Sequence, residues 1–246
     1  MTPLAATFAL IVSALAGFLR GFTGFGSALA AVPLLSLVLE PIDVVPCVLV
    51  LQVVAGLQLL RRVWSEVDWA SLRPLLLGAL AGTPLGTLLL SHLPDDAMRA
   101  AIGLIVLAAV VLLRGGVGLE ARPRLAMRLG VGWLSGVLNG ATAMGGPPVI
   151  LFFLATSSSV AVGRASLLAY FFFLSIGSLA VAAGAGLVSQ HTLVLSLVML
   201  PGIALGNSLG DRTFRRSSAD AYRRVVMAVL SVIALASIGR AIASQW

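Results

Sequence analysis

The near absence of charge over long stretches of the chain most constrains its fold. A soluble domain carries about a quarter charged residues, whereas here charged residues make up 10% and hydrophobic residues 59% of the 246 positions. The apolar runs have the length of helices and lack the alternation of a transmembrane β-strand. They cover residues 4–19, 25–39, 44–60, 74–91, 100–113, 125–138, 147–157, 165–185, 192–210 and 225–241. The sequence therefore predicts an all-α membrane protein.

The charged residues lie mostly between these runs. The 16 basic residues are all arginine, against nine acidic ones, which gives a formal net charge of +7. Short arginine clusters between apolar runs are typical of topology signals and not of a nucleic-acid-binding surface. The pair Asp211-Arg212 is interpreted as a turn or a helix start. A single cysteine, Cys47, excludes an intrachain disulfide, and the start of the chain lacks the basic region of a cleavable signal peptide.

The sequence also repeats itself at a shift of about half its length. Positions 115 apart match in three pairs, which are Gly17 with Gly132, Gly21 with Gly136, and Pro33 with Pro148. The glycines at 78, 82 and 86 have counterparts at 202, 206 and 210. We therefore predict two structural repeats, residues 1–118 and 119–246. Each would consist of a broken, Gly-rich helical hairpin followed by three transmembrane helices.

The short runs at the start of each half decide the predicted topology. They span about 16 and 15 residues in the first half and 14 and 11 in the second, below the roughly 20 needed to cross a bilayer. If each pair returns to its side of entry, three crossings follow and the halves are inverted; two thin crossings would leave the parity unchanged. One face then holds Arg61, Arg62, Arg73, Arg114, Arg122, Arg124, Arg128, Arg164, Arg212, Arg215, Arg216, Arg223 and Arg224, with only Arg99 and Arg240 opposite. This face is expected in the cytoplasm and both termini outside.

The two Gly-rich segments, 17–27 and 136–148, are the candidate binding site. Interrupted helices at membrane depth are tolerated where they line a wet cavity, so the two breaks are expected to meet. The second half-helix of each pair starts with free N–H groups and a positive dipole end, which favours an anion. The predicted substrate-binding glycines are Gly21, Gly24, Gly26, Gly140, Gly145 and Gly146.

Arg20 is the sharpest single candidate, because a cation within an apolar run needs a partner or a ligand. It could bind an anion through its planar fork. The alternative is that it reaches the interface or pairs with Asp43 or Glu40. For Arg164, a topology role is favoured over a gate or pathway role.

Neutral polar groups accompany the two breaks. Thr23, Ser27, Asn139 and Thr142 could orient an oxyanion or could cap the half-helices. Gln52 and Gln58 could line the substrate path or form hydrogen bonds between helices. Tyr170 could reach a cavity, although the aromatic stretch around it is more typical of core or lipid-facing residues. The stepped glycines from 78 and from 202 indicate close helix packing.

The sequence gives little support for an enzyme. The spacing of glycines from Gly21 to Gly26 lacks the strand and helix of a nucleotide-binding unit. His92 and His191 stand in connecting segments without the neighbours of a metal site, and no run pairs a nucleophile with a base. We therefore expect no enzymatic activity, cofactor or metal.

The two Gly-rich segments, 21–27 followed by Pro33 and 136–148, resemble the paired signatures of the TauE/SafE family, also called the sulfite exporter family. The resemblance covers nearly the whole chain. It implies a bacterial inner-membrane transporter for small anions such as sulfite, sulfonates and other organosulfur or carboxylate anions. The second segment departs from the usual form at Ala141, Thr142 and Ala143, which leaves the substrate open.

The leading hypothesis is export of an anion by alternating access, driven by the membrane potential because the runs hold no acidic residue at depth. An anion channel and a non-transporting scaffold are the alternatives. The expected partners are a small anion and the lipid bilayer, with a homo-oligomer allowed and no nucleic acid.

Overall fold

The computed structural model describes residues 3–94, 96–98, 100–101, 104, 123–218, 220–222 and 224–225. Its main elements are α1 (Pro3–Thr23), α2 (Ser27–Leu35), α3 (Pro41–Val63), the 3₁₀ turn η1 (Trp64–Glu66), α4 (Trp69–His92), α6 (Leu125–Thr142), α7 (Gly146–Thr156), α8 (Val160–Gly184) and α9 (Gln190–Arg215). Within these residues the chain is helical and contains no strand, which confirms the all-α prediction.

Five of the described helical segments are long and apolar enough to cross a membrane. They are Ala6–Thr23, Pro41–Glu66, Trp69–His92, Val160–Gly184 and Gln190–Arg215. The chain is therefore an integral, multi-pass membrane protein. The run predicted at 225–241, most of the run at 100–113 and the joint between the halves lie outside the described residues.

The prediction of two short half-helices at the start of the chain is wrong for the first of them. α1 has 21 residues and continues through Gly17, Arg20 and Gly21, whereas α2 has only nine residues. Glycine in a helix costs only about 1 kcal/mol relative to alanine, and this cost is offset here by close packing. The hairpin thus joins a long helix to a short one.

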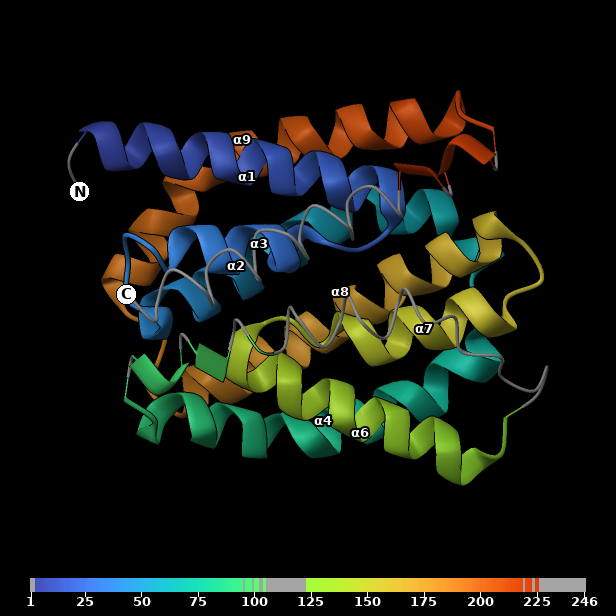
Figure 1. The fold of residues 1–246 in the computed structure, drawn as a ribbon, viewed down its shortest axis with the longest axis horizontal. Helices are drawn as coiled ribbons and strands as arrows, with labels where there is room; N and C mark the ends of the chain where they lie inside the picture. The colour runs from blue at the N-terminus through green and yellow to red at the C-terminus, as the bar shows by residue number, and fades with distance from the viewer. Residues whose placement is uncertain are drawn as a thin grey trace.

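From α1 to α4, and again from α6 to α9, successive helices run in opposite directions along one axis (Figure 1). α1, α3 and α9 run in one direction, and α2 returns beside α1 toward the end where α1 begins. The end of α3, the start of α4, the start of α6 and the end of α9 all lie at the opposite end of the bundle. That end carries the described arginines Arg61, Arg62, Arg73, Arg124, Arg128, Arg164, Arg212, Arg215 and Arg216.

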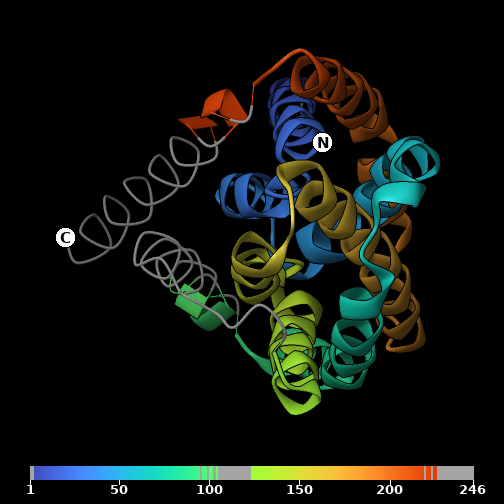
Figure 2. The same ribbon diagram turned by 90° about the vertical axis from the view of Figure 1, so that its right-hand side faces the viewer.

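Two glycine-lined helix pairs stand at opposite sides of the bundle (Figure 2). α1 packs along α9, and α6 packs along α4. A Cβ added at Gly206 would overlap the carbonyl oxygen of Ala14, and one at Gly82 would overlap that of Trp133. Small residues let helix backbones approach this closely in membranes. The helix-packing interpretation of the stepped glycines is therefore confirmed.

α3 and α8 join these two pairs. α3 packs against α8 and α9, and α8 packs against α4. Tyr170, Phe171 and Phe172 of α8 are buried in this central region, so this aromatic stretch belongs to the core. The two helix breaks come together around α3 and α8.

Candidate functional site

Each Gly-rich segment breaks over only three residues. α1 ends at Thr23 and α2 begins at Ser27, while α6 ends at Thr142 and α7 begins at Gly146. Left-handed backbone turns the chain at Gly24 (φ 87°), at Gly26 (φ 90°) and at Ala143 (φ 55°). The broader interruptions predicted from Gly17 and from Gly136 are wrong, since both glycines lie inside helices.

The two breaks share two local hydrogen bonds at positions 119 apart. The Thr23 hydroxyl donates to the Leu19 carbonyl over 2.7 Å and accepts from the Phe25 amide over 3.2 Å. The Thr142 hydroxyl donates to Leu138 over 2.7 Å and accepts from Met144 over 3.3 Å. These bonds support the capping alternative for both threonines. The alignment at 115 that paired Pro33 with Pro148 therefore does not match the breaks, and Pro33 lies inside α2.

A cavity lies between the breaks and is lined by residues of both. Arg20, Gly26 and Ser27 line it from the first break, and Ala143, Met144 and Gly146 from the second. Gln52 of α3 and Phe171 of α8 complete its wall together with Phe25, Ala28 and Leu29. The expectation that two breaks far apart in sequence meet around one space is thus confirmed.

Arg20 brings a buried cation to this cavity. Its side chain is 0% exposed, and Nη1 donates to Gln52 Oε1 at the long distance of 3.5 Å. Its Nε and Nη2 find no hydrogen-bond partner among the residues that the structure describes. Gln52 in turn donates to the Ala143 carbonyl over 3.3 Å. Gln52 therefore bridges the two breaks, and the guanidinium keeps donors free for a ligand.

The alternatives weighed for Arg20 do not apply within the described part of the chain. Arg20 is fully buried, which excludes an interfacial position. Asp43 instead pairs with His191 over 3.2 Å, where α9 begins. Glu40 precedes α3 and is exposed.

The start of α2 adds a second attraction for negative charge. Its N-cap, Gly26, makes no side-chain capping bond, and the first-turn residues Ser27, Ala28 and Leu29 line the cavity. The first N–H groups of a helix have no intrahelical partner, so they can bind an anion. α7 offers less, because Pro147 and Pro148 carry no N–H in its first turn.

Behind the first break, Arg164 and Tyr222 hold the last carbonyls of α1. Arg164 Nε donates to the Phe22 carbonyl over 3.1 Å, and Nη2 donates to that of Gly21. Tyr222 donates its hydroxyl to the Thr23 carbonyl over 2.9 Å. Burial raises the pKa of Tyr222 to about 12, so the phenol keeps its proton. A cation at a helix C-terminus is favourable, and Arg164 therefore does more than set topology.

Asp211 of α9 forms an ion pair with Arg164 of α8 and neutralises its charge. The two side chains are 4% and 3% exposed and lie 2.9 Å apart. Arg62 and Arg215 approach the same carboxylate at 3.1 and 3.2 Å, and both are more than half exposed. The interpretation of Asp211-Arg212 as a turn or a helix start is wrong, because both residues lie inside α9.

The second break is held by neutral groups. Asn139 donates to Ser178 Oγ over 2.9 Å and accepts from the Gly145 amide over 3.4 Å. Ser135 donates to the Gly145 carbonyl, and Tyr170 donates to Ser135 over 2.9 Å. These contacts lie behind the cavity. Tyr170 thus supports the second break and does not line the space.

The predicted site residues therefore fall into two groups. Arg20, Gly26, Ser27, Gln52 and Gly146 line the cavity. The others support the breaks from behind or pack against neighbouring helices, and these are Gly21, Thr23, Gly24, Asn139, Gly140, Thr142, Gly145, Arg164 and Tyr170.

Sequence reasoning missed several contributors. Phe25, Met144 and Phe171 line the cavity, but apolar residues in apolar runs give no separate signal. Asp211 did have a signal in the sequence. The four-residue glycine spacing that ends at Gly210 implies a packed helix that continues to that point. Asn207 donates to Gln58 over 2.8 Å, which favours the helix-joining interpretation of Gln58.

These features define a multi-pass membrane protein with a buried, cation-bearing internal site between two interrupted helices. The chain belongs to the sulfite exporter TauE/SafE family, whose family model matches residues 9–237. Members of this family are membrane transporters of the anion-exporter type, not enzymes. No curated protein and no solved structure gives a significant match.

Proposed function

We propose that this protein exports sulfite or a related organosulfur or carboxylate anion across the bacterial inner membrane and binds it at Arg20. The observation that carries the proposal is the fully buried guanidinium, with Nε and Nη2 unpartnered in the described part of the chain, at a cavity between the two breaks. Charge-assisted hydrogen bonds to an oxyanion are short and strong, and the uncapped start of α2 adds further donors.

The two halves are inverted repeats in this proposal. Support comes from the breaks at equivalent positions 119 apart with matching threonine bonds, and from the pairing of α1 with α9 and of α6 with α4. Rocking of inverted halves around a central site exposes that site alternately to the two sides. The space between the breaks is then the point about which the halves move.

The Arg-rich end of the bundle faces the cytoplasm, and both termini face the periplasm, in this proposal. The positive-inside rule supports this orientation, because the described arginines of α3, α4, α8 and α9, together with Arg124 and Arg128 at the start of α6, gather at one end. Asp211 lies outside the cavity lining and is surrounded by three arginines. We therefore keep the membrane potential as the driving force, which moves a unit negative charge outward with about 2.3 kcal/mol per 100 mV.

Arg164 serves this function as a positioning residue. It ties the first break to α9 through Asp211, on the side of the break next to the Arg-rich end. Release of this ion pair would free the end of α1. The pair is thus placed to act as an inner gate between the cytoplasm and Arg20.

Sulfite flux in proteoliposomes tests the proposal. We expect saturable flux in the wild type, a loss of at least about 100-fold in Arg20→Ala from the missing charged contacts, and a smaller loss in Asn139→Ala. Arg61→Ala, an exposed arginine, is the matched control and keeps wild-type flux. Unchanged flux in Arg20→Ala would overturn the proposal, and flux that fails to saturate would favour a channel. An imposed potential without effect would remove the proposed driving force.

A further inference from the structure

Three arginines converge on one carboxylate at the Arg-rich end of the bundle. Arg62 Nη1 and Arg215 Nη2 lie 3.1 and 3.2 Å from Asp211 Oδ2. Arg164 Nη2 lies 2.9 Å from Oδ1 of the same side chain. The three cations come from the end of α3, the end of α9 and the start of α8. One carboxylate neutralises only one of them, so the group keeps an excess of positive charge.

The other charged groups nearby do not remove this excess. Glu66 of η1 also attracts Arg164, whereas the exposed Arg61, Arg212 and Arg216 add three positive charges at the same end of the bundle. An anion that binds there is therefore attracted by uncompensated positive charge.

Arg62 and Arg215 are placed to share a ligand. Their side chains are 57% and 55% exposed, whereas that of Asp211 is 3% exposed. Both guanidinium groups contact the same carboxylate oxygen, so they lie next to each other around it. Each guanidinium has five N–H donors, of which the contact with Asp211 uses one. A small oxyanion on the solvent side can therefore accept hydrogen bonds from both arginines.

Contacts inside the protein connect this group to the Arg20 site. Asp211 pairs with Arg164, and Arg164 donates to the carbonyl of Gly21, the residue after Arg20 in α1. The exposed arginines thus lie at the surface end of a series of contacts that leads to the first break.

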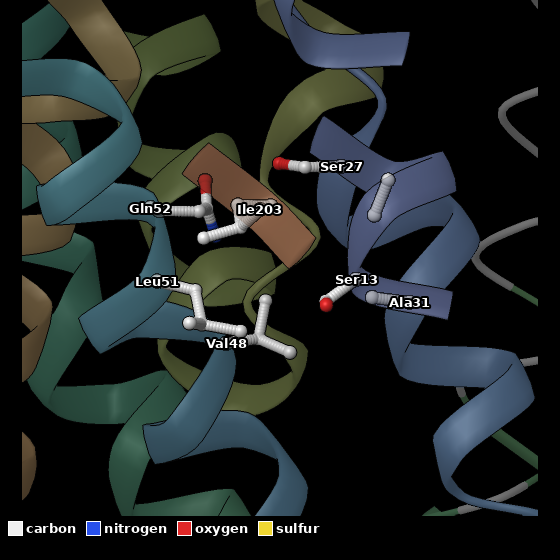
Figure 3. A pocket seen from close by; sticks show the side chains of 8 residues that line it. Ser13, Ser27, Ala31, Val48, Leu51, Gln52 and Ile203 are labelled. Atoms are coloured by element: carbon white, nitrogen blue, oxygen red, sulfur yellow. The ribbon is translucent and has the colours of Figure 1, made fainter. Parts of the chain in front are cut away.

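The opposite side of the Arg20 site offers an anion no such group. A second cavity shares Ser27 and Gln52 with the Arg20 cavity and lies toward the start of α1. Figure 3 shows Val48 and Ile203 in its wall. No charged side chain is among its described lining residues. Capture of an anion is therefore favoured from the Arg-rich end.

We propose that Arg62 and Arg215 form a capture site, separate from the Arg20 site, at which a small oxyanion binds on the cytoplasmic side before it passes Arg164. This inference rests on the proposed function, because it takes the transported anion as the ligand. A phospholipid headgroup carries the same oxyanion chemistry, and the experiments below separate the two sources. A capture site acts by raising the local concentration of substrate.

The anomalous signal of selenite locates the capture site directly. In Arg20→Ala, which lacks the central site, a selenium peak is expected with selenite oxygens within about 3 Å of the guanidinium groups of both Arg62 and Arg215. This peak is expected to disappear in Arg62→Gln/Arg215→Gln. Its absence from both the wild type and Arg20→Ala would overturn the capture site.

Sulfite flux in proteoliposomes tests whether the site serves transport. In Arg62→Gln/Arg215→Gln, kcat/KM at low ionic strength is expected to fall about tenfold, because substrate is no longer concentrated at the entrance. The loss is expected to shrink below about twofold in about 1 M potassium gluconate, where charges are screened within about 3 Å. A loss of kcat/KM that does not change with salt would overturn the inference. The single variant Arg62→Gln, with an expected loss of about threefold, decides the matter if the double variant fails to fold.

The matched control removes two arginines from the same two helices. Arg61 and Arg212 are exposed residues of α3 and α9 and are not part of the described ion pairs at Asp211. Arg61→Gln/Arg212→Gln is expected to change kcat/KM by less than about twofold. An equal loss in this control would show that the overall potential of the Arg-rich end suffices, and would overturn a discrete site.

Two lipid compositions separate the sources of the oxyanion. The loss in Arg62→Gln/Arg215→Gln is expected both in phosphatidylcholine liposomes and in liposomes that also contain phosphatidylglycerol. A loss seen only with phosphatidylglycerol would assign the two arginines to a lipid headgroup and overturn the capture of substrate. Normal flux in Arg20→Ala would instead overturn the proposed function, whatever binds at Arg62 and Arg215.

Discussion

The two helix breaks share a backbone course and differ in charge. The first is surrounded by arginines, with Arg20 in the cavity and Arg164 behind it, paired with Asp211. The second is held by the neutral side chains of Asn139 and Ser135. The two breaks therefore differ in their hydrogen-bond donors. The first break has the free donors of Arg20, whereas the donors of Ser135, Asn139 and the Gly145 amide at the second break all have acceptors. We infer that the first break recognises the anion and the second forms the wall against which it is held.

The largest expected effect follows from removing the charge that supports the first break. Asp211→Ala leaves Arg164 buried without its carboxylate, which destabilises a protein by about 3–5 kcal/mol. The free energy of unfolding in detergent, measured by denaturant titration, checks this. Asp43→Ala is the control, since its pair with His191 is partly exposed and is worth less than about 1 kcal/mol. Equal effects of the two variants would show that the first break does not depend on buried charge.

The neutral break gives the next largest effect. Asn139→Ala removes the acceptor of the Gly145 amide and the donor to Ser178, and unpaired buried groups of this kind cost about 1–3 kcal/mol. The same titration measures the loss of stability, and anion-induced thermal stabilisation measures binding. Binding persists in weakened form because Arg20 is unchanged. If Asn139→Ala abolished binding as completely as Arg20→Ala, the division of roles between the breaks would be wrong.

The two breaks also differ in the residue that adopts the left-handed backbone conformation, and a smaller effect on stability is expected there. Gly24 has φ 87°, and a Cβ added there would lie 2.9 Å from the Arg164 carbonyl oxygen. Gly24→Ala is therefore expected to cost about 1–2 kcal/mol from the left-handed conformation alone. Ala143 already tolerates φ 55°, and Ala143→Gly is expected to change stability by less than about 1 kcal/mol. Unfolding of both variants under one set of conditions makes the comparison. A larger loss for Ala143→Gly than for Gly24→Ala would contradict this account of the turns.

The smallest effects are expected where the breaks are alike. Thr23→Val and Thr142→Val each remove a hydroxyl that bonds only to nearby backbone, at a cost of about 1 kcal/mol. The two losses of unfolding free energy are expected to agree within about 0.5 kcal/mol. A specific loss of anion affinity in either variant would instead place that hydroxyl in contact with the substrate.

The sequence predicted those parts of this arrangement that depend on composition and on small residues. Apolar length identified the membrane helices, and the stepped glycines identified the close helix pairs. It also placed two breaks together with Arg20 beside them. These signals are local, because each follows from what one segment needs in lipid.

The other features of the fold and the site could not be predicted, because they depend on contacts between residues that are remote in sequence. The length of α1 was underestimated because Arg20 looked like the end of a run, whereas its burial at the cavity lets the helix continue. The role of Asp211 was missed because its partners Arg62 and Arg164 are remote in sequence. The separation of Ser27, which lines the cavity, from Thr23, which caps a helix, likewise required the geometry.

The most direct test of the Arg20 site is a structure of the protein with selenite, a sulfite analogue whose selenium atom gives an anomalous signal. The account predicts one anomalous peak in the cavity between the two breaks, with selenite oxygens within about 3 Å of Arg20 Nε or Nη2. Such a peak is expected to disappear in Arg20→Ala. Selenium bound only at the exposed Arg62 and Arg215, with the cavity at Arg20 free of it, would contradict the account.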